Sequence, residues 1–257
     1  MGGGKPAMAQ YARFAALYDM FMDDVDYDGW AKYIAELIGR PCCTVLECGC
    51  GTGEITVRLK KLGFDITGSD ISRDMLEVAS EKARRNGLRI PFVRMDMRNI
   101  ALHRQVDCIV APCDCVNYLT SIRACEEFFQ SAYSVIKPGG LLLFDVSSRY
   151  KLKNILGMNT FSDSREDAAY IWRNNYDSER KLIEMELEFF VRAGESIDGT
   201  PLFERFTETH IQRAHSEQEL HSRLEGAGFK VKNVFDAFKF IPPGEDCERL
   251  QFIAIKQ

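Results

Sequence analysis

Residues 44–53 read Thr-Val-Leu-Glu-Cys-Gly-Cys-Gly-Thr-Gly, and this stretch decides the fold. Its first three residues are short, largely apolar and partly β-branched, as expected of a buried parallel strand. Gly49, Gly51 and Gly53 then alternate through a tight turn into a helix that we expect to begin near Glu54. Glycines at such a turn accept left-handed angles and let a ligand approach the main chain closely. The stretch therefore predicts the strand–turn–helix of a ligand-binding α/β domain.

The glycine spacing differs from the dinucleotide fingerprint G-x-G-x-x-G, because the third glycine comes one residue early. Glu54 stands where that glycine should be, and Glu47 lies directly before the turn. A carboxylate at that point does not suit a pyrophosphate. It suits a cationic, amine-bearing ligand instead.

Further acidic and polar residues follow the next predicted strands. Asp70 ends a strand about 20 residues after the glycines, where a carboxylate can accept both ribose hydroxyl hydrogens. The alternative role for Asp70, as N-cap of the helix over residues 72–84, is already partly filled by Ser72. Asp96 follows the segment 90–95. The segment 106–113 predicts a buried strand that runs into a polar loop containing Asn117.

These motifs, with the turn Lys-Pro-Gly-Gly at residues 137–140 before an apolar strand over 141–146, resemble those of class I S-adenosylmethionine-dependent methyltransferases. The resemblance implies S-adenosylmethionine as cofactor and S-adenosylhomocysteine as product. It also implies that Asp96 accepts from the adenine amino group and that the Met97 amide faces the ring. The full set of cofactor-binding residues that we expect is Tyr11, Tyr18, Trp30, Glu47, Gly49, Gly51, Gly53, Asp70, Ile71, Met75, Asp96, Met97, Cys113 and Asn117.

The N-terminal region resembles that of one branch of this family, which includes enzymes similar to sugar-amine and glycine N-methyltransferases. That branch begins with Tyr-x-x-Phe-Ala-x-x-Tyr-Asp, matched here by residues 11–19, and carries a three-stranded insert after the fifth strand. By resemblance, residues 8–40 form a helical lid over the cofactor. Aromatic rings near a sulfonium attract it. Tyr11 and Tyr18 are the favoured contacts, whereas Trp30 is equally well explained as core.

The fold that we expect is an α/β Rossmann-like, doubly wound sheet of seven mostly parallel strands with the last one antiparallel. The core covers residues 41–150 and 215–257, and residues 1–7 read as a tail or a cloning remnant. Residues 151–214 form the antiparallel insert, since 181–191 alternate between apolar and acidic side chains with period two. Segments 169–174 and 202–213 are its expected partners, and a capped helix over 216–227 follows.

Composition narrows the class of protein further. The chain has 257 residues, a net charge of −5, 46% hydrophobic and 28% charged residues. We therefore expect a soluble, cytoplasmic protein, a monomer or homodimer, that binds neither nucleic acid nor membrane. Nine cysteines without a signal peptide indicate free thiols in a reducing compartment. The pairs at 48/50 and 113/115 favour small buried packing residues over a metal or redox site, because zinc ligands are usually spaced more widely.

The acceptor is predicted to be a small molecule held against the insert. His210, on an insert strand, is the candidate general base, and Tyr11 is the second candidate catalytic residue. The alternatives are an S-adenosylmethionine-binding protein without transfer activity and a nicotinamide-dependent oxidoreductase. The glycine spacing and Glu47 argue against the oxidoreductase. The expected lid and insert favour an enzyme over a binding protein without transfer activity.

Overall fold

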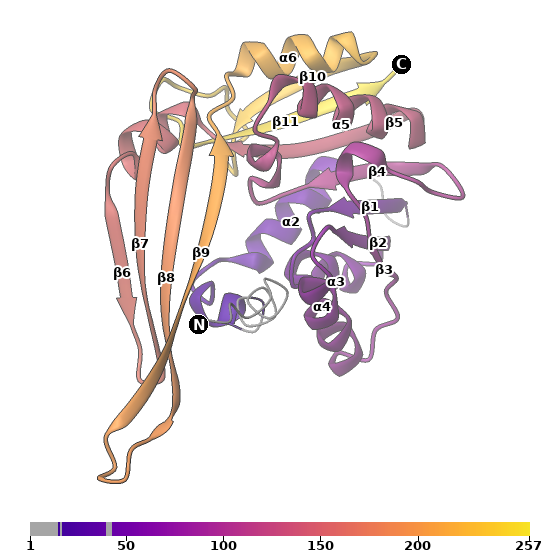
Figure 1. The fold of residues 1–257 in the computed structure, drawn as a ribbon. Helices are drawn as coiled ribbons and strands as arrows, with labels where there is room; N and C mark the ends of the chain where they lie inside the picture. The colour runs from indigo at the N-terminus through magenta and orange to yellow at the C-terminus, as the bar shows by residue number, and fades with distance from the viewer. Residues whose placement is uncertain (1–14, 16, 40–42) are drawn as a thin grey trace.

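A computed structural model describes residues 15, 17–39 and 43–257, and its centre is a seven-stranded sheet of order β10-β11-β5-β4-β1-β2-β3 (Figure 1). Its strands are β1 (Thr44–Cys48), β2 (Asp65–Asp70), β3 (Phe92–Arg94), β4 (Val106–Ala111), β5 (Ile136–Ser147), β10 (Phe229–Asp236) and β11 (Arg249–Lys256). Strand β11 runs antiparallel to both neighbours, and the remaining pairs are parallel. The predicted doubly wound sheet with an antiparallel last strand is confirmed.

Helices cover both faces of this sheet. On one face α2 (Tyr27–Ile38) and α3 (Glu54–Lys61) bury Trp30, Ile34 and Leu59 against β1, β4 and β5, and α4 (Arg73–Arg85) packs beside α3. On the other face α5 (Ile122–Val135) and α6 (Glu217–Gly226) bury Phe128 and Phe129. Two separate apolar cores therefore hold the sheet rigid between them.

Local signals in the sequence set several helix ends. Ser72 caps α4 by accepting from the Met75 amide, as expected. Ser216 and Glu219 form the predicted capping box of α6. Helix α2 begins at Tyr27, because Asp26 caps it by accepting from Gly29 N at 2.8 Å. The predicted turn at 137–140 belongs to β5, where the pairing with β4 shifts register.

The insert is a second sheet of order β6-β7-β8-β9, fully antiparallel, which stands beside the first sheet in Figure 1. Its strands are β6 (Thr160–Ser164), β7 (Ala168–Asp177), β8 (Leu182–Glu195) and β9 (Pro201–Arg213). The expectation of three strands was wrong, since β6 adds a fourth. A short helical turn, η3 (Lys151–Leu156), joins the insert to β5, and η1 (Met97–Asn99) and η2 (Cys115–Tyr118) follow β3 and β4.

Asn117 joins the two sheets and is fully buried. Its Nδ2 donates to Ser147 O at 3.0 Å and to Arg213 O at 2.9 Å, and its Oδ1 accepts from Ser147 N at 2.9 Å. The side chain thus fixes the end of β5 to the end of β9. Asn117 is not among the residues that line the cavity at the edge of the main sheet, and its role as a cofactor contact stays a prediction.

We expect Asn117→Ala to lower the free energy of unfolding by about 2–3 kcal/mol, because three hydrogen bonds are lost and their buried partners are left unsatisfied. Urea denaturation measures this loss. A variant as stable as the wild type would contradict the structural role of Asn117.

Candidate functional site

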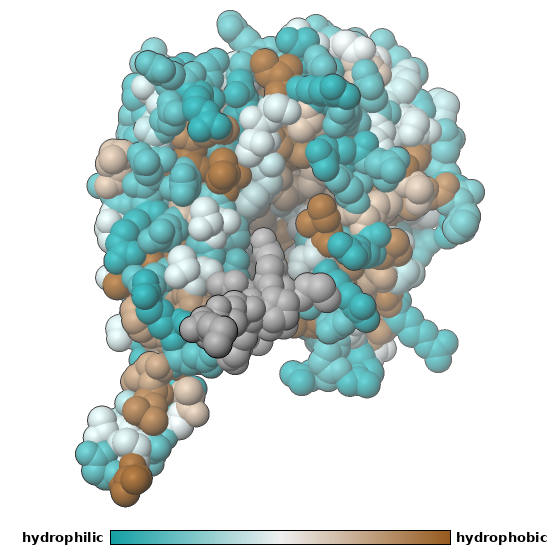
Figure 2. Space-filling view, in the orientation of Figure 1, coloured by the Kyte–Doolittle hydropathy of each residue, from teal (hydrophilic) through white to brown (hydrophobic). Residues whose placement is uncertain are grey.

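A cavity of about 890 Å³ lies between the carboxyl edge of the main sheet and the inner face of the insert. The space-filling view shows the molecule hollowed between these two parts (Figure 2). Its volume falls within the range of about 300–1,000 Å³ typical of ligand sites. Of the predicted cofactor residues, those that line it are Tyr18, Glu47, Gly49, Gly51, Asp70, Ile71, Met75, Asp96, Met97 and Cys113.

The glycine turn forms the floor of this cavity. Gly49, Gly51 and Gly53 all have positive φ angles, of 68°, 51° and 78°. A Cβ at Gly51 would meet no atom of the described residues within 4 Å, whereas at Gly49 it would collide with Cys115 at 2.8 Å. Gly51 therefore leaves space for a ligand. Gly53 does not line the cavity. It lies against Ala79 and is the N-cap residue of α3, so its cofactor contact stays a prediction.

Asp70 shapes the glycine turn. Its two carboxylate oxygens accept from Gly51 N at 2.9 Å and from Ser72 N at 2.8 Å. Burial raises the pKa of Asp70, and these two backbone hydrogen bonds oppose the rise. Asp70 thereby joins the turn after β1 to the start of α4 at the edge of the cavity.

Glu47 is the most deeply buried acid of the cavity, with 1% of its surface exposed. Thr56 Oγ1 donates to its Oε2 at 2.6 Å. Burial raises the pKa of Glu47 to about 8, and the Thr56 hydrogen bond only partly offsets this. A carboxylate in such surroundings gains strongly from a cationic ligand.

Asp96 and Met97 lie at the opposite side of the cavity floor. The Asp96 carboxylate accepts from Arg98 Nε at 3.0 Å and from the Arg98 backbone amide at 2.9 Å, so its pKa lies below the usual range. The acid is therefore ionised at neutral pH and already oriented by Arg98.

The three aromatic residues that were expected to contact the cofactor differ in where the structure places them. Tyr18 lines the cavity and is half-buried there. Tyr11 lies outside the described residues. Trp30 does not line the cavity. It packs edge-on against Phe238 at 4.5 Å and under the Arg249 guanidinium at 5.4 Å, which agrees with the alternative that Trp30 is a core residue.

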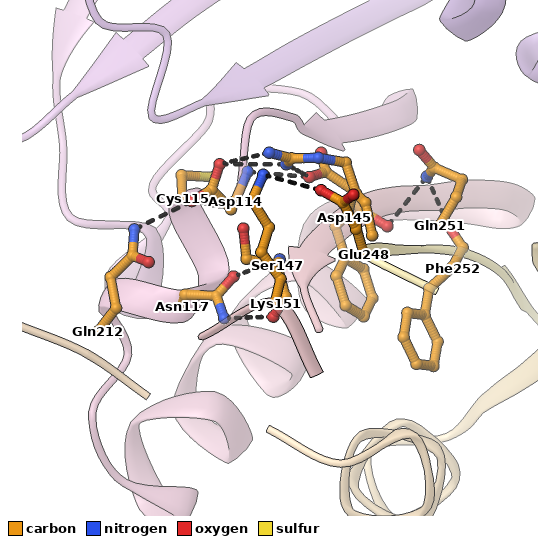
Figure 3. A network of polar contacts seen from close by, with 12 residues as sticks. Asp114, Cys115, Asn117, Asp145, Ser147, Lys151, Gln212, Glu248, Gln251 and Phe252 are labelled. Atoms are coloured by element: carbon orange, nitrogen blue, oxygen red, sulfur yellow. Dashed lines mark hydrogen bonds and ion pairs between the residues drawn. The ribbon is translucent and has the colours of Figure 1, made fainter. Parts of the chain in front are cut away.

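The loop after β4 is held in a strained conformation at the cavity wall. Cys113 and Asp114 have φ angles of +57° and +49°, each of which costs a non-glycine residue about 1–3 kcal/mol. Figure 3 shows what holds the loop: Asp114 accepts from Gln212 at 3.0 Å and from Arg249 at 3.1 Å. Its backbone amide donates to Asp145 at 2.9 Å. The members of this network are far apart in the chain, so no sequence motif predicts it.

The four cysteines of the two pairs gather at this edge, as expected. Cys50, Cys113 and Cys115 line the cavity, and Cys115 Sγ lies 3.5 Å from Cys48 O. Burial raises the pKa of each thiol. Among the described residues, no group of three or more His, Cys, Asp or Glu is placed to hold a metal ion. These thiols are small packing groups in the described structure.

The insert supplies the opposite wall. His210 lines the cavity, and its Nδ1 lies 3.2 Å from the Tyr118 hydroxyl. Burial lowers the pKa of His210, which keeps the imidazole neutral at pH 7. Around it are apolar and aromatic lining residues of the same sheet, namely Tyr170, Trp172, Met185, Leu187 and Phe189.

The chain belongs to the class I S-adenosylmethionine-dependent methyltransferases, and it is an enzyme of that class with S-adenosylmethionine as its cofactor. The family model described as "Methyltransferase domain" matches residues 45–140. A putative methyltransferase, YqeM, of Bacillus subtilis (strain 168) is 38% identical over 250 residues, covering 96% of this chain and 97% of that protein.

Two further proteins are similar to this chain, one over nearly its whole length and one over about half of it. An S-adenosylmethionine-dependent methyltransferase from Clostridium acetobutylicum ATCC 824 superposes with a TM-score of 0.84 at 28% identity, covering 96% of this chain and 99% of that one. A glycine/sarcosine N-methyltransferase of Halorhodospira halochloris is 31% identical over 134 residues, which is 49% of this chain and 50% of that protein.

We expect Asp70→Ala to weaken S-adenosylmethionine binding by about 1–3 kcal/mol, because a charge-assisted acceptor is removed and the Gly51 amide loses its partner. Isothermal titration calorimetry measures the affinity, with circular dichroism as the check on folding. An unchanged affinity in the folded variant would remove Asp70 from the site.

Proposed function

We propose that the enzyme transfers the sulfonium methyl of S-adenosylmethionine to nitrogen or oxygen of a small-molecule acceptor inside this cavity. The observation that carries the proposal is that Gly51 of the cofactor turn and His210 of the insert line one continuous space. The cavity is closed on the acceptor side by the insert, which favours a small acceptor over nucleic acid. Among the described residues, no helix is long and apolar enough to cross a membrane.

In this proposal the cofactor lies along the floor of the cavity. The buried Glu47 faces its amino group, Asp70 accepts from the ribose hydroxyls, and Asp96 with the Met97 amide binds the adenine. Tyr18 provides an aromatic wall for the sulfonium, an attraction of about 1–2 kcal/mol when water is excluded. Ile71, Met75 and Cys113 complete the apolar lining.

A lid formed by the N-terminal region covers the cofactor in this proposal. Three contacts support it: Thr52 Oγ1 donates to Asp19 Oδ1 at 2.6 Å, Lys82 Nζ lies 2.7 Å from Asp19 Oδ2, and Arg165 of the insert pairs with Asp23 at 2.7 Å. The segment 17–23 is thus joined both to the glycine turn and to the insert.

Methyl transfer needs alignment more than covalent help from the protein, because the sulfonium methyl is already activated. In-line positioning of the acceptor is worth roughly 7–11 kcal/mol. His210, whose Nδ1 lies 3.2 Å from the Tyr118 hydroxyl, serves as general base for a proton of the acceptor.

The test uses S-adenosylmethionine with a deuterated methyl group and a cellular small-molecule fraction as the source of acceptor. We expect S-adenosylhomocysteine to form together with a labelled product seen by mass spectrometry, and His210→Ala to lower the rate by about 100-fold or more. Cofactor binding without any labelled product from any fraction would favour the non-catalytic alternative. A normal rate in the His210→Ala variant would exclude His210 as the general base.

A further inference from the structure

Glu54 is the residue that stands where a dinucleotide-binding turn has its third glycine, and it begins helix α3. Its side chain lines the cavity and pairs with two cations, Lys82 of α4 and Arg58 of α3. Burial raises the pKa of Glu54, but the hydrogen bonds from Lys82 and Arg58 outweigh this effect, so the pKa lies below its usual value. Cations of the protein therefore neutralise this acid of the glycine turn.

The Lys82 ammonium group joins Glu54 to the N-terminal segment. Its Nζ lies 2.7 Å from Asp19 Oδ2 and 3.2 Å from Thr52 Oγ1, in addition to its pairing with Glu54. The Thr52 hydroxyl belongs to the glycine turn and donates its own hydrogen to Asp19 Oδ1 at 2.6 Å. An ammonium group has three donors, and here three acceptors surround it. Lys82 thus connects Asp19, the glycine turn and α4 through a single charge.

This network is largely withdrawn from water. The side chains of Lys82 and Glu54 are 17% and 19% exposed, and Thr52 is buried. Fully exposed ion pairs contribute little, whereas charge-assisted hydrogen bonds within a shielded network are strong. Lys82 itself is not among the residues that line the cavity. Its contacts therefore attach Asp19 to the glycine turn from outside the ligand site.

The attached segment carries cavity-lining side chains. Residues 17–21 are helical, and Tyr18, directly before Asp19, lines the cavity. The same charges continue to the start of α2, because Arg58 pairs with Asp28 and its guanidinium carbon lies 5.5 Å from the centre of the Tyr27 ring. Tyr27 also lines the cavity. Alternating charges, namely Asp19, Lys82, Glu54, Arg58 and Asp28, therefore hold both tyrosines from behind.

Building on the proposed function, we propose that Lys82 is a positioning residue for the cofactor, which holds Tyr18 in the cavity wall by binding Asp19, Thr52 and Glu54 together. Lys82 touches neither cofactor nor acceptor and acts through Asp19. Without its charge the carboxylates of Asp19 and Glu54 lose the cation between them and repel each other. The segment that carries Tyr18 then separates from the glycine turn more often, and the bound cofactor dissociates faster.

The binding experiment uses the full chain, S-adenosylhomocysteine as the probe, and the variants Lys82→Met, Asp19→Asn and their combination. We expect Lys82→Met to bind the probe about tenfold more weakly, mainly through faster dissociation, because the closed arrangement is less populated. The double variant should bind no more weakly than the weaker single variant, since both changes remove one interaction. Arg85→Met is the matched control on α4, where Arg85 pairs with Glu81 at 2.9 Å, and it should keep the wild-type affinity.

Hydrogen–deuterium exchange of the free proteins separates positioning from a general loss of structure. In Lys82→Met the amides of residues 17–23 should exchange at least about tenfold faster than in the wild type, while those of β1 and β4 keep their rates. Unchanged exchange of residues 17–23, faster exchange throughout the sheet, an unchanged affinity, additive losses in the double variant, or an equal loss in Arg85→Met would each overturn the role of Lys82. Failure of the wild type to bind S-adenosylhomocysteine would instead contradict the proposed function.

Discussion

Gly51→Val is expected to abolish binding of S-adenosylmethionine, with a loss of at least about 100-fold, or about 2.8 kcal/mol. Within the part of the chain that the structure describes, a Cβ at Gly51 has no neighbouring atom within 4 Å, so a valine side chain enters the cavity and not the core. The fold should survive, since the added cost is the strain of a β-branched residue at φ +51°. Calorimetry measures binding, and circular dichroism with urea denaturation measures the fold.

The chain offers a matched control for the strain. Gly87 follows α4, has φ +68°, and likewise has nothing within 4 Å of an added Cβ, yet it does not line the cavity. Gly87→Val should lose comparable stability and keep full cofactor affinity. Normal binding by Gly51→Val, or equal loss of binding by both variants, would show that the glycine turn does not receive the cofactor.

Glu47 should dominate the pH dependence of stability. Its pKa is about 8 in the folded protein, against 4.5 as the usual value, because burial disfavours the charged form. There is therefore a range of pH over which the Glu47 carboxyl group is protonated in the native state and already deprotonated in the unfolded state. The stability that Glu47 contributes is fully present below pH 4.5 and is lost as the pH rises through about 8.

The measurement compares the wild type with Glu47→Gln by urea denaturation at pH 5 and at pH 9. We expect the stability of the wild type, relative to the variant, to fall by about 4 kcal/mol between these two values. This is less than the full shift from 4.5 to about 8 would give, because Glu47 of the unfolded state has already lost most of its proton at pH 5. Parallel pH profiles for the two proteins would contradict a shifted, buried Glu47.

Much of the core was predictable because its signals are local. The strand before the glycines, the acid that ends β2 and the capping box of α6 each depend on residues a few positions apart. Period-two alternation likewise identified β8. Strand β6 was missed because Thr160–Ser164 is short, mostly polar and lies at the edge of its sheet, so its sequence carries no such alternation.

The site was less predictable because it depends on which way side chains point. Trp30 belongs to a helix whose apolar side faces the main sheet, and periodicity does not say which partner that side meets. The sequence predicts Asn117 as a polar loop residue, yet its side-chain amide donates hydrogen bonds to backbone carbonyls of two distant strands.

A crystal structure of the enzyme with bound S-adenosylmethionine tests the central claim most directly. The account predicts the cofactor along the cavity floor, with its amino group at Glu47, its ribose at Asp70 and its methyl group facing His210 on the insert. A cofactor outside this cavity, or one whose methyl group points away from the insert, would contradict it.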